Sequence, residues 1–298
     1  MFRNSSVRRL LHTRFILASK RQIGSVSIGS KFTANYKQYL KLSNGELGSY
    51  FHDIQLDLND KERTINMITE VSRWSNGKFE ISKELEFNPI VQDVKNGKVR
   101  FVHNLFPYHG YIHNYGAIPQ TWEDSTANST ILGTEMLKGD NDPLDCCEIG
   151  SKLLNTGELS KVKVIGSLAL IDDGELDWKV IVINTEDPMA SKVNDLNDVN
   201  TFFPGLLEAT REWFRNYKIP AGKPPNSFAF DGDYKNTEET MEIIRKCHES
   251  WKKLVSGSLH KEFNKLPEIK RAGSGVTMQN SVGSPVTIPE EVNKWHYI

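Results

Sequence analysis

Three aspartates fall within six residues of one another in the segment Gly139-Asp140-Asn141-Asp142-Pro143-Leu144-Asp145. Carboxylate oxygens are the ligands that hard cations such as Mg²⁺ prefer. A calcium-binding EF-hand loop needs glycine at its sixth position and glutamate at its twelfth, where this chain has Asp145 and Ser151. Because Asp and Asn also favour turns, the spacing alone leaves a solvated acidic turn as an alternative to a metal site.

A second acidic cluster lies thirty residues further on, with four carboxylates in six residues: Asp172, Asp173, Glu175 and Asp177. The pair Asp173-Gly174 is typical of a hairpin turn. A turn does not explain four neighbouring acids, which repel one another unless cations bind between them. On a strand, Asp177 and Lys179 would point to the same face.

Basic and phenolic side chains are interleaved with these acids. Lys78 and Glu80 share a strand face, and Arg100 interrupts an apolar strand. Residues 111–115 are aromatic and polar, and Tyr217-Lys218 ends a predicted helix. Acids alone would fit a module that stores cations. Acids together with Lys, Arg and Tyr favour a metal-bound polyphosphate, although each basic residue alone is more often a surface charge.

Several other function classes are excluded by motif and composition. The chain has no Gly-x₄-Gly-Lys-Ser/Thr phosphate loop and no His-Glu-x-x-His zinc motif. Its three cysteines have no Cys-x-x-Cys spacing, which argues against a disulfide scaffold or a structural zinc site. No apolar run approaches the roughly 20 residues that span a bilayer.

Charge is distributed unevenly along the 298 residues. No acid precedes Glu46, and residues 1–45 contain nine of the 37 Lys and Arg residues. The remaining 28 basic residues face all 38 acidic ones, so the body of the chain is about ten charges negative. This balance argues against a general nucleic-acid binder, which neutralises phosphates with a basic surface.

The composition of residues 1–30, which are rich in Arg and Ser and free of acids, predicts a cleaved mitochondrial transit peptide. A secretory signal fits less well, because the apolar run Phe15-Ile16-Leu17-Ala18 is short, and a disordered basic arm is the remaining alternative. Residues 31–298 are then expected to form a single domain, with an extended tail from about residue 256.

Periodicity predicts an α+β fold in which strands precede helices. Alternation over 78–82 predicts a strand with Phe79 and Ile81 inward, and 98–102 is a second candidate strand. Residues 162–171 and 178–184 are predicted to form a hairpin. Helices are expected at about 206–217 and 238–255, the latter with Thr237 as N-cap and Gly257 after its end. The helices would cover one side of a β-barrel or curled sheet.

These motifs together resemble the soluble family I inorganic pyrophosphatases. The string Asp140-Asn141-Asp142-Pro143-Leu144-Asp145 matches the family's D-x-D-P-x-D signature. The likeness runs from about residue 40 to about 255 with the spacing of the eukaryotic branch, and the leader makes the chain similar to a fungal-type mitochondrial member. Residues 125–130 look longer than the usual loop at that place. Further matching segments are Glu70 to Trp74, Lys78 to Glu84, Phe106 to Gly116, Asp172 to Lys179 and Tyr217 to Pro220.

The resemblance implies a fold, an assembly and a set of roles. It implies a five-stranded, OB-like β-barrel with flanking helices, and a homodimer with Arg73, Trp74 and His109 near the contact. Mg²⁺, for which Mn²⁺ or another divalent cation can substitute, would be held by Asp140, Asp145, Asp172, Asp177 and Glu80. Asp142 would orient and help deprotonate the attacking water. Phosphate would be contacted by Lys78, Arg100, Tyr115, Tyr217 and Lys218, with support from Glu70, Tyr111, Glu175 and Lys179.

The implied reaction is hydrolysis of pyrophosphate to two orthophosphates by a metal-activated water, with no covalent intermediate. In the mitochondrial matrix this would remove pyrophosphate from biosynthetic reactions. Two other functions stay open at this point. One is a non-catalytic OB module that binds single-stranded nucleic acid. The other is a metal-dependent phosphohydrolase acting on nucleotides or sugar phosphates.

Overall fold

The computed structural model describes residues 23–259 and 266–298. Residues 1–22 of the predicted transit peptide therefore lie outside the described part. The last residues of the predicted transit peptide overlap the folded body. Strand β1 (Gly24–Gly29) pairs antiparallel with β2 (Lys37–Lys41), and Val26 is buried. The folded body thus begins before residue 30.

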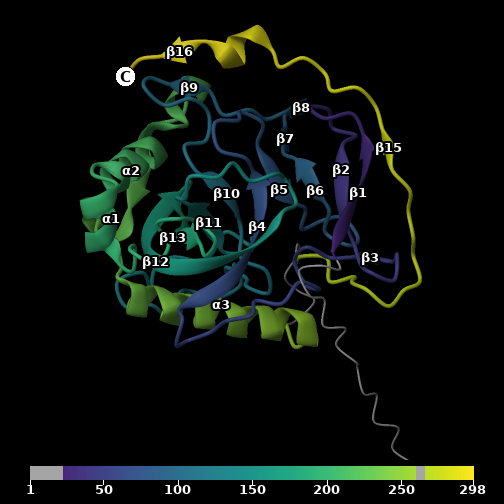
Figure 1. Ribbon diagram of the computed structural model, residues 1–298, viewed down its shortest axis with the longest axis horizontal. Coiled ribbons are helices and arrows are strands. Elements are labelled where there is room, and N and C mark those ends of the chain that lie inside the picture. The colour runs from purple at the N-terminus through teal and green to yellow at the C-terminus, as the bar shows by residue number, and fades with distance from the viewer. Residues whose placement is uncertain (1–22, 260–265) are drawn as a thin grey trace, which may run out of the picture.

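A central mixed sheet carries most of the core. Its strand order is β13-β11-β10-β4-β12-β14, and β12 also pairs with β13, so the hydrogen bonding returns to the first strand (Figure 1). The strands are β4 (Thr64–Val71), β10 (Asn114–Ala117), β11 (Asp145–Glu148), β12 (Leu159–Asp172), β13 (Glu175–Asn184) and β14 (Ser227–Phe228).

The predicted hairpin is confirmed as β12 and β13, whose register pairs Asp172 with Glu175. Asp173 and Gly174 form its turn with φ angles of 49° and 92°. Positive φ at both central positions suits the right-handed twist of a two-residue hairpin. The turn therefore holds the second acidic cluster at the end of two long, buried strands.

A second sheet has the order β15-β1-β2-β6-β5, with β3 (Leu47–Gly48) paired to β2. Its strand β5 (Phe79–Ile81) confirms the predicted alternation, since Phe79 and Ile81 are buried. The candidate strand at 98–102 is shorter than predicted: β8 (Lys98–Val99) pairs with β7 (Val94–Lys95), and beyond Arg100 only a single bridge joins Phe101 to Gly77. The remaining strands are β6 (Ile90–Gln92) and β15 (Ser281–Val282).

Among the described residues, three α-helices flank the central sheet: α1 (Leu196–Phe202), α2 (Leu206–Asn216) and α3 (Thr237–Ser256). The prediction of helices on one side only is wrong, because α1 and α2 lie at one flank while α3 runs beneath the sheet (Figure 1). The predicted N-cap Thr237 is also wrong. Asn236 caps α3 in a capping box with Glu239, while the Thr237 hydroxyl donates to the Ile165 carbonyl.

The C-terminal segment 266–298 runs as an extended strap around the rim of the molecule (Figure 1). Within it, β15 pairs in parallel with β1, and β16 (Trp295–His296) pairs in parallel with β9 (Asn104–Leu105). The Glu268 carbonyl accepts a hydrogen bond from Asn88 at 2.9 Å, which holds the start of the strap, ahead of both pairings. In the part of the chain that the structure describes, no helix has the length and apolarity to cross a membrane.

Candidate active site

All fifteen residues predicted for the site line one cavity of about 450 Å³. Nine of its lining residues are acids and seven are Lys or Arg. A cavity with similar numbers of acidic and basic side chains suits an anion bound together with metal ions better than it suits metal ions alone. The fifteen are Glu70, Lys78, Glu80, Arg100, Tyr111, Tyr115, Asp140, Asp142, Asp145, Asp172, Glu175, Asp177, Lys179, Tyr217 and Lys218.

Strand β13 supplies the buried centre of this cavity. Its alternation directs Glu175, Asp177 and Lys179 inward. Parallel pairing with β11 sets Asp145 beside Lys179, whose Nζ donates to Asp145 Oδ2 at 2.5 Å, to the Tyr115 hydroxyl at 2.9 Å and to Asp177. Burial alone would lower the pKa of Lys179, but the carboxylates of Asp145 and Asp177 outweigh it and raise that pKa well above its usual range.

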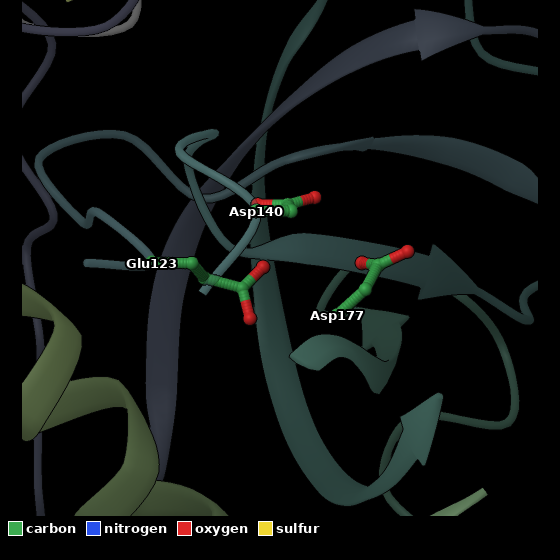
Figure 2. A group of neighbouring side chains, drawn as sticks. All are labelled: Glu123, Asp140 and Asp177. Atoms are coloured by element: carbon green, nitrogen blue, oxygen red, sulfur yellow. The ribbon is translucent and has the colours of Figure 1, made fainter. Parts of the chain in front are cut away.

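Three carboxyl groups from separate segments meet beside this centre. Oxygens of Glu123, Asp140 and Asp177 all lie within 4.8 Å of one another (Figure 2). Burial, then the charges of neighbouring acids, raises the pKa of Glu123 and Asp140 well above the ordinary value. A bound cation would relieve this repulsion, so the trio is the strongest candidate metal group among the described residues.

Glu123 is the member of this group that sequence reasoning missed. Its Oε1 accepts a hydrogen bond from the Trp178 backbone N–H at 3.0 Å, which fixes the side chain. Its buried Oε2 has no hydrogen-bond partner among the described residues. An oxygen left unpaired at this depth is open to a cation or to a water that a cation holds.

The other predicted metal ligands each have a cationic partner. Glu80 pairs with Lys78, Asp172 pairs with Lys218, and Asp145 is bound by Lys179 and Tyr115 rather than joining the carboxyl trio. The structure thus gathers the predicted metal ligands into one cavity but brings only Asp140 and Asp177 to within chelating distance of a shared point.

Asp142 lies at the mouth of the cavity, where its carboxylate is 2.9 Å from Lys83 Nζ. Burial raises the pKa of Asp142 to about 6, with the Lys83 ammonium opposing the rise and Glu80 adding to it. Its backbone N–H donates to Asp140 Oδ1 at 3.0 Å, which ties it to the metal group. A carboxylate with a pKa near neutrality can accept a proton at working pH.

The candidate phosphate-binding cations are positioned by an acid that lacks a predicted role. Asp93 accepts hydrogen bonds from Lys78 Nζ at 3.2 Å and from Arg100. Burial raises the pKa of Asp93, but the two cations outweigh it and lower that pKa overall. Across the cavity, Tyr217 stacks on Trp213 with ring centroids 4.9 Å apart, which fixes the end of α2 that carries Lys218.

The missed residues left different signals in the sequence. Lys83 lies inside the matched string Lys78 to Glu84, so its pairing with Asp142 could have been sought there. Glu123 lies in an irregular segment without periodicity, and nothing in its spacing connects it to Asp140 or Asp177.

Gly139 allows the segment that carries Glu123 to pack against the Asp140 loop. A Cβ at Gly139 would lie 2.3 Å from the Glu123 carbonyl carbon, a contact with backbone that cannot yield without movement. We expect Gly139→Ala to separate the carboxyl trio and weaken Mg²⁺ binding at least about tenfold. Calorimetric titration of the metal tests this, with Gly24→Ala as control because its Cβ would meet nothing within 4 Å and its backbone has no positive φ. Unchanged affinity in Gly139→Ala would contradict the expectation.

The three residues predicted near a dimer contact lie outside the cavity. Trp74 is 57% exposed, His109 Nδ1 is 2.9 Å from the Trp74 carbonyl oxygen, and the Arg73 guanidinium lies 5.9 Å from the Trp74 ring. The strap adds Trp295, whose ring lies 5.9 Å from His109. These four side chains form an aromatic patch, in which Trp74, His109 and Trp295 face solvent and the Arg73 side chain is largely buried.

Comparison with known proteins identifies the family of this chain. A family model for inorganic pyrophosphatase matches residues 67–252. A Saccharomyces cerevisiae protein named inorganic pyrophosphatase, mitochondrial, is 61% identical over 296 residues, which cover 98% of this chain and 96% of that protein. The Candida albicans inorganic pyrophosphatase is 49% identical, with 94% of this chain and 97% of that one covered.

A solved structure points the same way. The inorganic pyrophosphatase of Schistosoma japonicum superposes with a TM-score of 0.83 at 44% identity, covering 92% of this chain and all of that one. Both the sequence relatives and the structural neighbour span nearly the whole chain. By sequence and by structure, this chain belongs to the inorganic pyrophosphatase family.

Proposed function

We propose that this chain hydrolyses inorganic pyrophosphate to two orthophosphates in a metal-dependent reaction. One observation carries the proposal: Asp140 and Asp177 line the same cavity as the cations expected to bind phosphate, and a Glu123 oxygen lies within 4.8 Å of both carboxylates. The names of the family's members support the choice of substrate.

Mg²⁺ is the metal that the donor set fits best. The trio offers only carboxylate oxygens, and Glu123 Oε2 is buried without a partner in the described chain. Asp145, Asp172 and Glu80 line the same cavity and would hold further ions, and Mn²⁺ can substitute. Bound metal lowers the pKa of a shared water and neutralises charge on the phosphate oxygens.

The protein's own groups orient the reaction. Asp142, held by Lys83, would position the attacking water and accept its proton. Lys78 and Arg100, aligned by Asp93, would contact one phosphate, and Lys218 would exchange its pairing with Asp172 for the other. The hydroxyls of Tyr115 and Tyr217 would complete the contacts, while Glu70, Tyr111, Glu175 and Lys179 support them. No step of this scheme needs a covalent intermediate.

A direct assay tests the proposed activity. Purified protein with pyrophosphate and Mg²⁺ should release orthophosphate, and EDTA should abolish the release. Equal release from ATP or a sugar phosphate would favour the broader phosphohydrolase instead. Salt-sensitive binding of single-stranded DNA without phosphate release would favour the nucleic-acid module.

We further propose that the five strands β4, β10, β11, β12 and β13 form a closed barrel of the OB type. The return of the pairing from β12 to β13 supports this. One domain would extend from Gly24 to the end of the strap, so that any transit peptide ends before β1. The mitochondrial relative and the acid-free leader support a location in the mitochondrial matrix, where hydrolysis would draw biosynthetic reactions forward.

The aromatic patch of Arg73, Trp74, His109 and Trp295 supports a homodimer. Exposed aromatic rings close to an arginine are typical of interface hot spots. We expect Trp74→Ala to shift the protein towards monomer at micromolar concentration, as measured by light scattering after gel filtration. Leu132→Ala is the matched control, since Leu132 is 85% exposed on a distant loop. A Trp74→Ala protein that stays dimeric at all concentrations would contradict this interface.

A further inference from the structure

A second cavity, of about 410 Å³, lies behind the catalytic one, and we call it the rear cavity. The alternation of β13 separates the two: Asp177 and Lys179 line the catalytic cavity, whereas Leu176 and Trp178 line the rear cavity. The rear cavity is closed by helix α3 and by the loop 122–131, which includes the residues that look longer than usual in this family. Of the groups that the proposed reaction uses, Glu123 alone also lines it.

The floor of the rear cavity contains an unmade hydrogen bond that the metal group does not account for. Trp178 is 1% exposed, and its Nε1–H has no acceptor among residues 23–259 and 266–298. Glu123 also lines this cavity, but its unpaired Oε2 is assigned to the candidate metal group. Buried polar atoms are normally paired, so each unpaired group calls for an explanation, and a ligand that supplies the partner is one.

The rim of the rear cavity carries two lysines that have no ion pair within the described chain. Lys246 and Lys253 lie seven residues apart on α3 and share a face. Lys246 Nζ donates only to the Thr130 carbonyl at 3.3 Å, and within the described chain neither ammonium pairs with a carboxylate. The other α3 charges here are compensated: Arg245 pairs with Asp60 and Glu242, and Glu249 pairs with Lys252. Asp124 is the remaining acid, and its carboxylate accepts from the Thr126 N–H and hydroxyl.

The walls between floor and rim are apolar. Trp122, Ile131 and Leu176 line them, together with the Trp178 ring. A site of this volume with apolar walls and a few convergent polar groups is typical of small-molecule binding. The chemistry therefore changes from hydrogen bonding at the floor, through apolar surface, to positive charge at the rim.

We propose that the rear cavity binds a small organic anion. Its carboxylate lies between Lys246 and Lys253, its planar apolar body lies against Trp122 and Ile131, and a polar atom of the ligand accepts the Trp178 Nε1 hydrogen bond. The pyrophosphate site is a different cavity on the opposite face of β13, so this binding does not depend on the proposed hydrolysis.

The probe for the test is 2-naphthoate, an aromatic carboxylate, with neutral 2-naphthamide as its isostere. Binding is followed by calorimetry and by the fluorescence of the cavity's two tryptophans. We expect naphthoate to bind below about 1 mM and the amide to bind at least about tenfold more weakly. In Lys246→Gln/Lys253→Gln, naphthoate affinity should fall at least about tenfold. Lys192→Gln, an exposed lysine outside the cavity, should leave it unchanged.

A competition experiment distinguishes the two cavities. Imidodiphosphate with Mg²⁺ fills the catalytic cavity, and bound naphthoate should remain in place. Ser250→Phe, which fills the rear cavity from α3, should remove naphthoate binding while pyrophosphate hydrolysis continues. Displacement of naphthoate by imidodiphosphate, unchanged binding in the double lysine variant, or no binding up to about 10 mM would each overturn the proposal.

Discussion

Replacing Asp142 by asparagine should lower kcat for pyrophosphate about 10²–10⁴-fold while changing Mg²⁺ affinity less than about threefold. The amide keeps the size of the side chain and still accepts a hydrogen bond from Lys83, but it cannot take a proton from water. Asp142 also lies outside the carboxyl trio, so its charge contributes less to holding metal than Asp140 does. Phosphate release over a range of Mg²⁺ concentrations gives kcat, and calorimetry without substrate gives the metal affinity.

The matched control for this variant is Asp60→Asn. Asp60 is a surface acid, 63% exposed and paired with Arg245, so its substitution should change neither quantity. Parallel losses of turnover and metal affinity in Asp142→Asn would show that Asp142 acts as a metal ligand and not as the group that orients water.

Lys179→Met should make the metal-free protein less stable by about 3–5 kcal/mol. The ammonium is 3% exposed and lies between Asp145 and Asp177, so its removal leaves two buried carboxylates without their cation. The same change should strengthen Mg²⁺ binding, because the metal replaces the missing positive charge. Mg²⁺ should therefore raise the free energy of unfolding more in this variant than in the unsubstituted protein.

Urea unfolding at about pH 8, with EDTA and with saturating Mg²⁺, measures both effects. Lys163→Met on the neighbouring strand β12 is the control. That ammonium donates to the Ala190 carbonyl and to Asn194 Oδ1 at 2.9 Å, so the loss of Lys163 should not change the response to Mg²⁺. If Mg²⁺ raises the free energy of unfolding of Lys179→Met no more than that of the unsubstituted protein, the metal does not replace the charge of Lys179, and the prediction is wrong.

Elements with a regular pattern of apolar residues were predictable from the sequence. The alternation at Phe79 and Ile81, and the long β-branched runs around the Asp173-Gly174 turn, specify strands by local pattern alone. Elements stabilised by distant parts of the chain were not. Strand β1 has small polar residues and depends on β2 and on β15, which lies about 250 residues away. Helix α1 has seven residues, of which only Val199 is buried, so it shows no apolar stripe.

The candidate site was likewise predictable only in part. Two acidic strings and the family resemblance supplied its residue types, and all of them line the cavity. Their convergence depends on pairings that spacing does not reveal, such as the parallel register that sets Asp145 beside Lys179. Glu123 was missed for this reason, because its closeness to Asp177 arises from a backbone hydrogen bond with Trp178 across 55 residues.

The C-terminal strap has a consequence for biogenesis. Because β1 pairs with β15, the first and last strands of the second sheet come from opposite ends of the polypeptide. A chain still emerging from a ribosome or a translocase therefore exposes the outer edge of β1 until synthesis or import is almost complete. Such an open edge invites pairing with other chains. We expect versions truncated before Ser281 to aggregate during production, even though every residue of the catalytic cavity is present in them.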